Sequence, residues 1–157
     1  MKNIYFPDEE VTSNDLLFVC YMIERVSRRL KQPNIYTAET LGTDALRHEL
    51  SVANVQHCEN PLDVEDRWIE RYHLVPGTYD VSDVDPELCE HFPSAINIAK
   101  VYRRLMLNTT YDGEDYDQAI LRVYRSPICR TIDNYNCSAF YEPPIVVARA
   151  YYEEGFH

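Results

Sequence analysis

The stretch at residues 14–31, NDLLFVCYMIERVSRRLK, decides the fold of this chain. It holds no proline or glycine, and its apolar residues recur at steps of three and four, the period of a helix with one buried face. These apolar residues are Leu16, Val19, Cys20, Ile23, Val26 and Leu30. The opposite face is expected to carry the charged residues Glu24, Arg25, Arg28, Arg29 and Lys31. We therefore predict a core helix around which the other elements pack.

The remaining chain predicts further short helices that are separated by proline and glycine. Segments 37–41 and 44–57 flank Gly42, a residue that suits the left-handed end of a helix. Other helices are expected over 61–73, 93–107, 114–124, 128–135 and 144–155. No stretch alternates apolar and polar residues convincingly for more than four positions. The predicted fold is mainly α, a compact bundle of six or more short helices with at most a minor strand pair.

The predicted core is formed by the first long helix together with the helix that Pro93 opens. Its members are Leu16, Val19, Ile23, Val26, Ile98, Tyr102 and Leu105. A chain of 157 residues fits a single domain, 1–157, and can bury a core without metal or disulfide help. Two halves, 1–76 and 92–157, are also conceivable, joined by an acidic connector at 77–91.

Charge is distributed unevenly along the chain. The formal net charge is −11, and residues 34–91 hold three cations against thirteen anions. Such an acidic field repels phosphate backbones, so we expect no nucleic-acid partner. No apolar run reaches the ~18 residues of a membrane span, so no membrane association is expected. Five cysteines, an odd number, without a secretion signal predict reduced thiols and a cytoplasmic location.

Two sets of charged residues are candidate binding surfaces. The first set is two arginine pairs, one in RVSRRL at 25–30 and one in KVYRRL at 100–105. These two stretches are similar, and whether they are a true internal repeat is left open. The members of this set, Arg28, Arg29, Arg103 and Arg104, would form an anion or partner site if the two helices brought them together. Alternatively, they pair with acidic residues of the middle region. The second set is Asp63, Asp66 and Glu70, which share one helix stripe opposite Val64 and Trp68.

Metal-ligating residues occur without the spacing of a metal site. His57-Cys58 and Cys89-Glu90-His91 contain residue types that can bind zinc. No CxxC or HxxxH motif, however, presents two ligands from one turn. GxSxG, Walker, GxGxxG and HExxH motifs are also missing. We therefore predict no metal, no cofactor and no catalytic residue, and an enzyme is the less favoured class.

Two stretches carry a resemblance to known proteins. They are DLLFVCYMIERVSRRLKQPNIYTAETLG at 15–42 and DNYNCSAFYEPPIVVARAYYEEG at 133–155. They resemble small uncharacterised proteins of gut-type bacteria, some of which lie beside candidate toxin or mobile-element genes. The resemblance implies a small bacterial interaction protein and assigns no site residue.

Together these patterns favour one function and leave a second open. The first is a protein–protein interaction or regulatory module whose acidic surface would meet a protein partner, with a basic partner favoured by charge and the oligomeric state left open. The second is an enzyme or small-anion binder that uses the arginine pairs. A helical pocket lined by Arg and Tyr would favour the second class, and a flat acidic face would favour the first.

Overall fold

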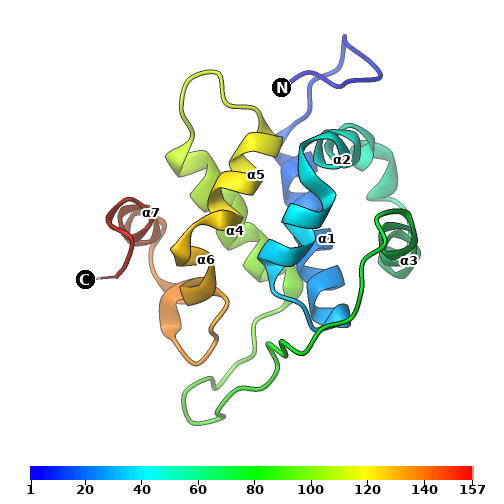
Figure 1. Cartoon of the computed structure of the whole chain (residues 1–157). Coiled ribbons are helices and arrows are strands. Elements are labelled where there is room, and N and C mark those ends of the chain that lie inside the picture. The colour runs from blue at the N-terminus through cyan, green and yellow to red at the C-terminus, as the bar shows by residue number, and fades with distance from the viewer. Residues whose placement is uncertain (157) are drawn as a thin grey trace.

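The computed structural model describes residues 1–156, and helices dominate that range (Figure 1). The α-helices are α1 (Ser13–Leu30), α2 (Asn34–Gln56), α3 (Pro61–Arg71), α4 (Ala95–Thr109), α5 (Tyr116–Arg125), α6 (Pro127–Ile132) and α7 (Pro144–Glu153). A short 3₁₀ helix, η1 (Ser138–Tyr141), precedes α7. Strand-like pairing within residues 1–156 amounts to one isolated antiparallel bridge between Lys2 and Glu10. The predicted mainly α bundle is confirmed.

Helix α1 lies at the centre of the bundle, where it packs against α2, α3 and α4. It begins at a capping box in which Thr12 and Asp15 satisfy each other's backbone N–H groups. It ends at Lys31, whose left-handed conformation stops the helix. Every residue of the predicted core is at most 2% exposed, including those on α4. The expectation of a core helix is therefore confirmed.

Helix α2 is broken at the glycine that the sequence singled out. Gly42 has φ 73° and ψ −178°, a combination that is essentially restricted to glycine. Residues on both sides of it are helical, so α2 consists of two helical pieces that meet at a kink. The predicted break at Gly42 is confirmed, although the first piece already begins at Asn34, after Pro33.

The acidic connector between α3 and α4 has no helix, and hydrogen bonds tie it to the bundle. The N–H groups of Gly77 and Tyr79 donate to the carbonyls of Leu30 and Lys31, both at 2.8 Å. Further on, the N–H of Asp85 donates to the Asn136 side chain at 2.7 Å. Figure 1 shows this green segment passing the end of α1 on its way to α4. The connector thus links the end of α1 to the loop that follows α6.

The two sequence halves share one core. Helix α1 packs on α4, and α2 packs on α5, as extensively as α1 packs on α2 within the first half. A single cluster of buried apolar residues runs through both halves. Among the helices of residues 1–156, none has both the length and the apolar character needed to cross a bilayer.

Candidate functional site

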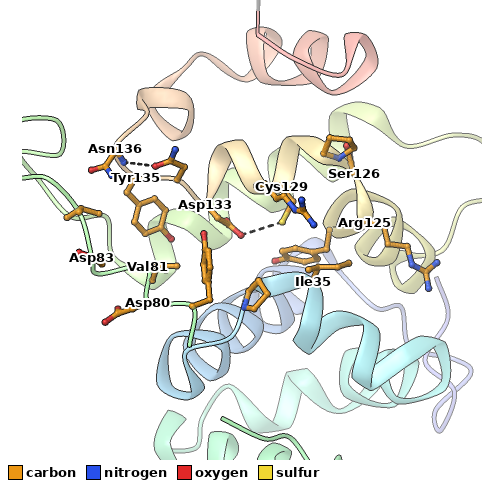
Figure 2. A pocket seen from close by; sticks show the side chains of 17 residues that line it. Ile35, Asp80, Val81, Asp83, Arg125, Ser126, Cys129, Asp133, Tyr135 and Asn136 are labelled. Atoms are coloured by element: carbon orange, nitrogen blue, oxygen red, sulfur yellow. Dashed lines mark hydrogen bonds between the residues drawn. The ribbon is translucent and has the colours of Figure 1, made fainter. Parts of the chain in front are cut away.

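A cavity of about 840 Å³ lies between the connector, the start of α2, the end of α5 and α6. The connector contributes Tyr79, Asp80, Val81, Asp83 and Val84. The opposite wall and floor comprise Tyr124, Arg125, Cys129, Arg130, Asp133, Tyr135 and Asn136. Figure 2 shows the labelled connector side chains on one side and Arg125 and Ser126 on the other. Tyrosine rings and apolar side chains therefore line the cavity together with charged and amide side chains.

Helix α6 places Cys129 and Asp133 together at the floor of this cavity. Ser126 caps the helix by accepting a hydrogen bond from the Ile128 N–H, and Pro127 occupies its first turn. Cys129 and Asp133 are four residues apart and so share one helix face. The Cys129 thiol donates to Asp133 Oδ2 at 3.4 Å, the dashed line between these two residues in Figure 2.

Asp133 is 4% exposed and accepts hydrogen bonds from three elements. Besides Cys129, the Tyr102 hydroxyl of α4 donates to Oδ1 at 2.5 Å, and Asn34 Nδ2 of α2 donates to Oδ2 at 3.1 Å. Burial and, second to it, the nearby carboxylate of Glu24 raise the pKa of Asp133 to about 8, although the three donors act in the opposite direction. Asp133 is therefore protonated in a large fraction of the molecules near neutral pH.

Glu24 forms a second buried carboxylate beside Asp133. It is 1% exposed and accepts from Arg28 Nε at 2.9 Å and from the Tyr135 hydroxyl at 2.6 Å. Asn34 Nδ2 also donates to Glu24, at 2.6 Å, so one amide bridges the two carboxylates. The Asn34 Oδ1 atom is buried and has no hydrogen-bond partner among the described residues. The expectation that Glu24 lies with the arginines on the face away from the core is wrong, because neighbouring helices supply polar partners that bury it.

The structure does not bring the four predicted arginines together. Arg28 binds Glu24 and stacks 4.9 Å from the Phe92 ring centroid, and Arg29 pairs with Asp66 at 2.7 Å. Arg103 instead donates to the Ser13 carbonyl at 3.4 Å, at the start of α1, and Arg104 is exposed. Because α4 runs antiparallel to α1, the two pairs are separated by most of its length, about 22 Å. No site containing all four guanidinium groups is formed.

The predicted acidic stripe is exposed on α3, on the face opposite Val64 and Trp68. Its residues are Asp63, Asp66 and Glu70. Asp66 is engaged by Arg29. The neighbouring Glu65 is 3% exposed and pairs with Arg25 at 2.8 Å, so it does not belong to this surface. The surface therefore keeps Asp63 and Glu70 as its freely exposed carboxylates.

The Cys/His groups lie apart from the cavity floor. His57 and Cys58 follow α2, and Cys89 and His91 lie on the connector. Within residues 1–156, no group of three or more His, Cys, Asp or Glu side chains is arranged to hold a metal ion.

Sequence reasoning missed the buried network, although two of its members left a signal. Tyr102 was assigned to the core, and a buried tyrosine hydroxyl needs a partner. Asp133 falls one helical turn after Cys129, beside the apolar residues Ile128 and Ile132. A carboxylate next to an apolar stripe indicates a buried polar contact, but the partner of Asp133 on α2, Asn34, is 99 residues away in the chain.

Comparisons of this chain with models of protein families, with curated proteins and with solved structures found no match. The fold and the site define a helical protein with a cavity that has polar residues at its floor. Its function is inferred from that geometry.

Proposed function

We propose that the protein binds a small organic molecule in the cavity beneath the acidic connector. The observation that carries the proposal is a cavity of about 840 Å³ with a buried pair of carboxylates. Asp133 lies at the floor of the cavity, and Glu24 lies behind it. Sites for small molecules typically enclose ~300–1,000 Å³, with apolar walls and a small number of placed polar groups. Perturbed ionisable groups such as Asp133 gather at such sites.

The lining supports ligand binding over a flat interaction surface. Tyr79, Tyr124 and Tyr135 contribute rings, while Arg125 and Arg130 contribute guanidinium groups. A helical pocket lined by Arg and Tyr is the feature that we expected to favour a binder of small molecules over an interaction module. None of the arginines in this pocket, however, belongs to the two predicted pairs. Burying two carboxylates costs free energy that apolar residues would not, which favours a role for this network beyond packing.

The test is a fragment screen by two-dimensional amide NMR, with a variant that fills the cavity. Val81 lies on the connector wall, so Val81→Trp places an indole inside the cavity. The matched control is Val75→Trp, because Val75 is on the same segment and 55% exposed. We expect fragments to shift amide signals around α6 and the connector in the wild type and the control, but not in Val81→Trp. Fragments that bind equally well to Val81→Trp would rule the cavity out.

A second function, binding of a basic protein partner, is supported by the pairing of cations in the acidic region. Arg47 pairs with Asp115 and Asp117, Arg67 with Glu59, and Arg71 with Glu49. All three cations of residues 34–91 are thus engaged by carboxylates. In the same region Asp63, Glu70, Asp83 and Asp85 are exposed. The outward charge is therefore negative over α3 and the connector, which suits electrostatic steering of a basic partner.

The second function is tested with a partner captured from cells of the native host. Asp63→Lys and Glu70→Lys should slow association at low salt, and the loss should shrink as salt rises, because exposed charges are screened beyond ~8–10 Å. Stability should change by less than about 0.5 kcal/mol, since both residues are exposed. Glu142→Lys, exposed but outside the acidic region, is the control. Association rates that are unchanged in both α3 variants would remove this surface from the mechanism.

A further inference from the structure

When Asp133 is ionised, the buried network at the cavity floor contains more negative than positive groups. Glu24 and Asp133 are both buried, and the Asn34 amide joins them. The cation of the network, Arg28, binds Glu24 and the Tyr135 hydroxyl. Within residues 1–156, no Lys, Arg or His forms an ion pair with Asp133. A buried carboxylate without a counter-charge is costly unless it takes up a proton or a ligand cation.

When Asp133 is ionised, it has a spare acceptor position, and neither Asp133 nor Asn34 has a spare donor. A carboxylate offers about four lone-pair positions, and Asp133 fills three with Tyr102, Asn34 and Cys129. The position left is on Oδ1, the oxygen that accepts only from Tyr102. Asn34 does not line the cavity itself, but its Oδ1 is buried without a hydrogen-bond partner, on the amide whose nitrogen lies 3.1 Å from Asp133. A ligand that reaches this floor must therefore supply hydrogen-bond donors.

The walls and the mouth of the cavity also suit a positively charged group. The rings of Tyr79, Tyr124 and Tyr135 line it, and aromatic faces attract organic cations. At the mouth, Asp80 and Asp83 are exposed carboxylates. Two arginines also line the cavity, but Glu39 engages Arg125, which leaves Arg130 as the opposing cation.

We propose that the molecule bound in this cavity is an organic amine, whose ammonium group donates to Asp133 while its apolar body packs against the tyrosine rings. This inference rests on the proposed small-molecule function and specifies the chemical class of the ligand. An anion or a neutral molecule of the same shape would supply no counter-charge for an ionised Asp133, and the carboxyl would then keep its proton.

Amine binding at this place is coupled to a proton. Several titratable, charged or amide groups face Asp133, and Arg28 lies behind one of them, Glu24. They are Glu24 on α1, Asn34 on α2, Tyr102 on α4, Tyr124 on α5, Cys129 on α6, Tyr135 after α6 and Tyr79 on the connector. The raised pKa of Asp133 means that the carboxyl must lose its proton to pair with an ammonium group. A primary amine keeps its charge up to about pH 10. Binding should therefore tighten as the pH rises from 6 to about 8 and release a proton.

Three indole compounds of matched shape test the charge. Isothermal titration of the wild type with tryptamine, tryptophol and indole-3-propionate compares an ammonium, a hydroxyl and a carboxylate on the same ring. We expect tryptamine to bind at least tenfold more tightly than either of the others. In Asp133→Asn this preference should disappear, whereas Asp112→Asn, at an exposed residue outside the cavity lining, should change the affinity for tryptamine by no more than about twofold. Titrations of the wild type at pH 6, 7 and 8, in two buffers of different ionisation enthalpy, measure the proton release without any mutation.

Several results would overturn the inference. Tryptophol or indole-3-propionate binding as tightly as tryptamine would show that charge is not selected. A pH-independent affinity of the wild type for tryptamine would remove Asp133 as its partner, even if Asp133→Asn does not fold. Absence of binding by all three compounds would likewise exclude the amine class. In that case the cavity still binds small molecules if uncharged fragments shift amides around α6 in the wild type but not in Val81→Trp. The proposed function itself fails when no fragment binds, or when fragments bind equally well to Val81→Trp.

Discussion

Glu24 and Asp133 depend on each other because a single donor, Asn34 Nδ2, bonds to both. Replacing Asn34 would leave two buried carboxylates facing each other with only Arg28 to offset them. The same arrangement explains the raised pKa of Asp133, since burial and the charge of Glu24 both disfavour its ionised form. At the scale of single residues, the buried network is thus the most pH-sensitive part of the molecule.

The raised pKa of Asp133 predicts that the stability of the folded protein falls as the pH rises. In the unfolded chain this carboxyl ionises near pH 4, whereas the folded protein holds its proton up to about pH 8. Between these values the folded state binds more protons, so the free energy of unfolding decreases as pH rises, by at most ~1.4 kcal/mol per pH unit for one proton. Urea denaturation of wild type and Asp133→Asn from pH 4.5 to 8.5 checks this. The variant should lose this part of the slope, and a stability difference that stays constant with pH would contradict it.

At the scale of elements, the connector completes the end of α1. The last carbonyls of a helix have no partner within it, and here Leu30 and Lys31 receive the N–H groups of Gly77 and Tyr79. The side chain of Gln32 adds a hydrogen bond to the Val75 carbonyl at 3.0 Å. These bonds hold one end of the connector in place, and that position gives the cavity its outer wall.

The kink in α2 depends on the backbone of one glycine. A methyl group added at Gly42 would meet nothing within 4 Å, so the cost of Gly42→Ala comes from the backbone conformation alone. We expect a loss of about 1–3 kcal/mol in the free energy of unfolding. Gly155→Ala, also without close neighbours and without a positive φ, should stay within about 0.5 kcal/mol. Equal urea midpoints for the two variants would show that α2 tolerates a straight path at this residue.

At the scale of the whole molecule, the two sequence halves are interdependent. Helices α1 and α2 bury their apolar faces against α4 and α5, which follow the connector. A fragment of residues 1–76 would expose these faces to water and lose much of its stabilisation. We expect this fragment to show weak helical circular dichroism and no cooperative thermal transition, in contrast to the full chain. A cooperative transition of the fragment would show that the first half has a core of its own.

Local patterns in the sequence were sufficient for the helices and for the buried face of α1. The three-to-four-residue spacing of Leu16, Val19, Ile23 and Val26 and the glycine at 42 are properties of neighbouring residues, and they act through backbone geometry and the burial of one face. These features therefore agree with the structure. Periodicity alone, however, assigned Glu24 to the wrong environment.

The placement of Glu24, Arg103 and Asp133 was decided only by the tertiary structure. Glu24 is buried because Asn34, on α2, and Tyr135, after α6, reach it across the fold. Arg103 lies far from Arg28 because α4 packs antiparallel to α1, and no local pattern specifies that direction. The cavity itself exists because the connector is tied to α1 at one end and to Asn136 at the other. Such contacts join residues that are distant in the chain, and their formation depends on how whole helices pack.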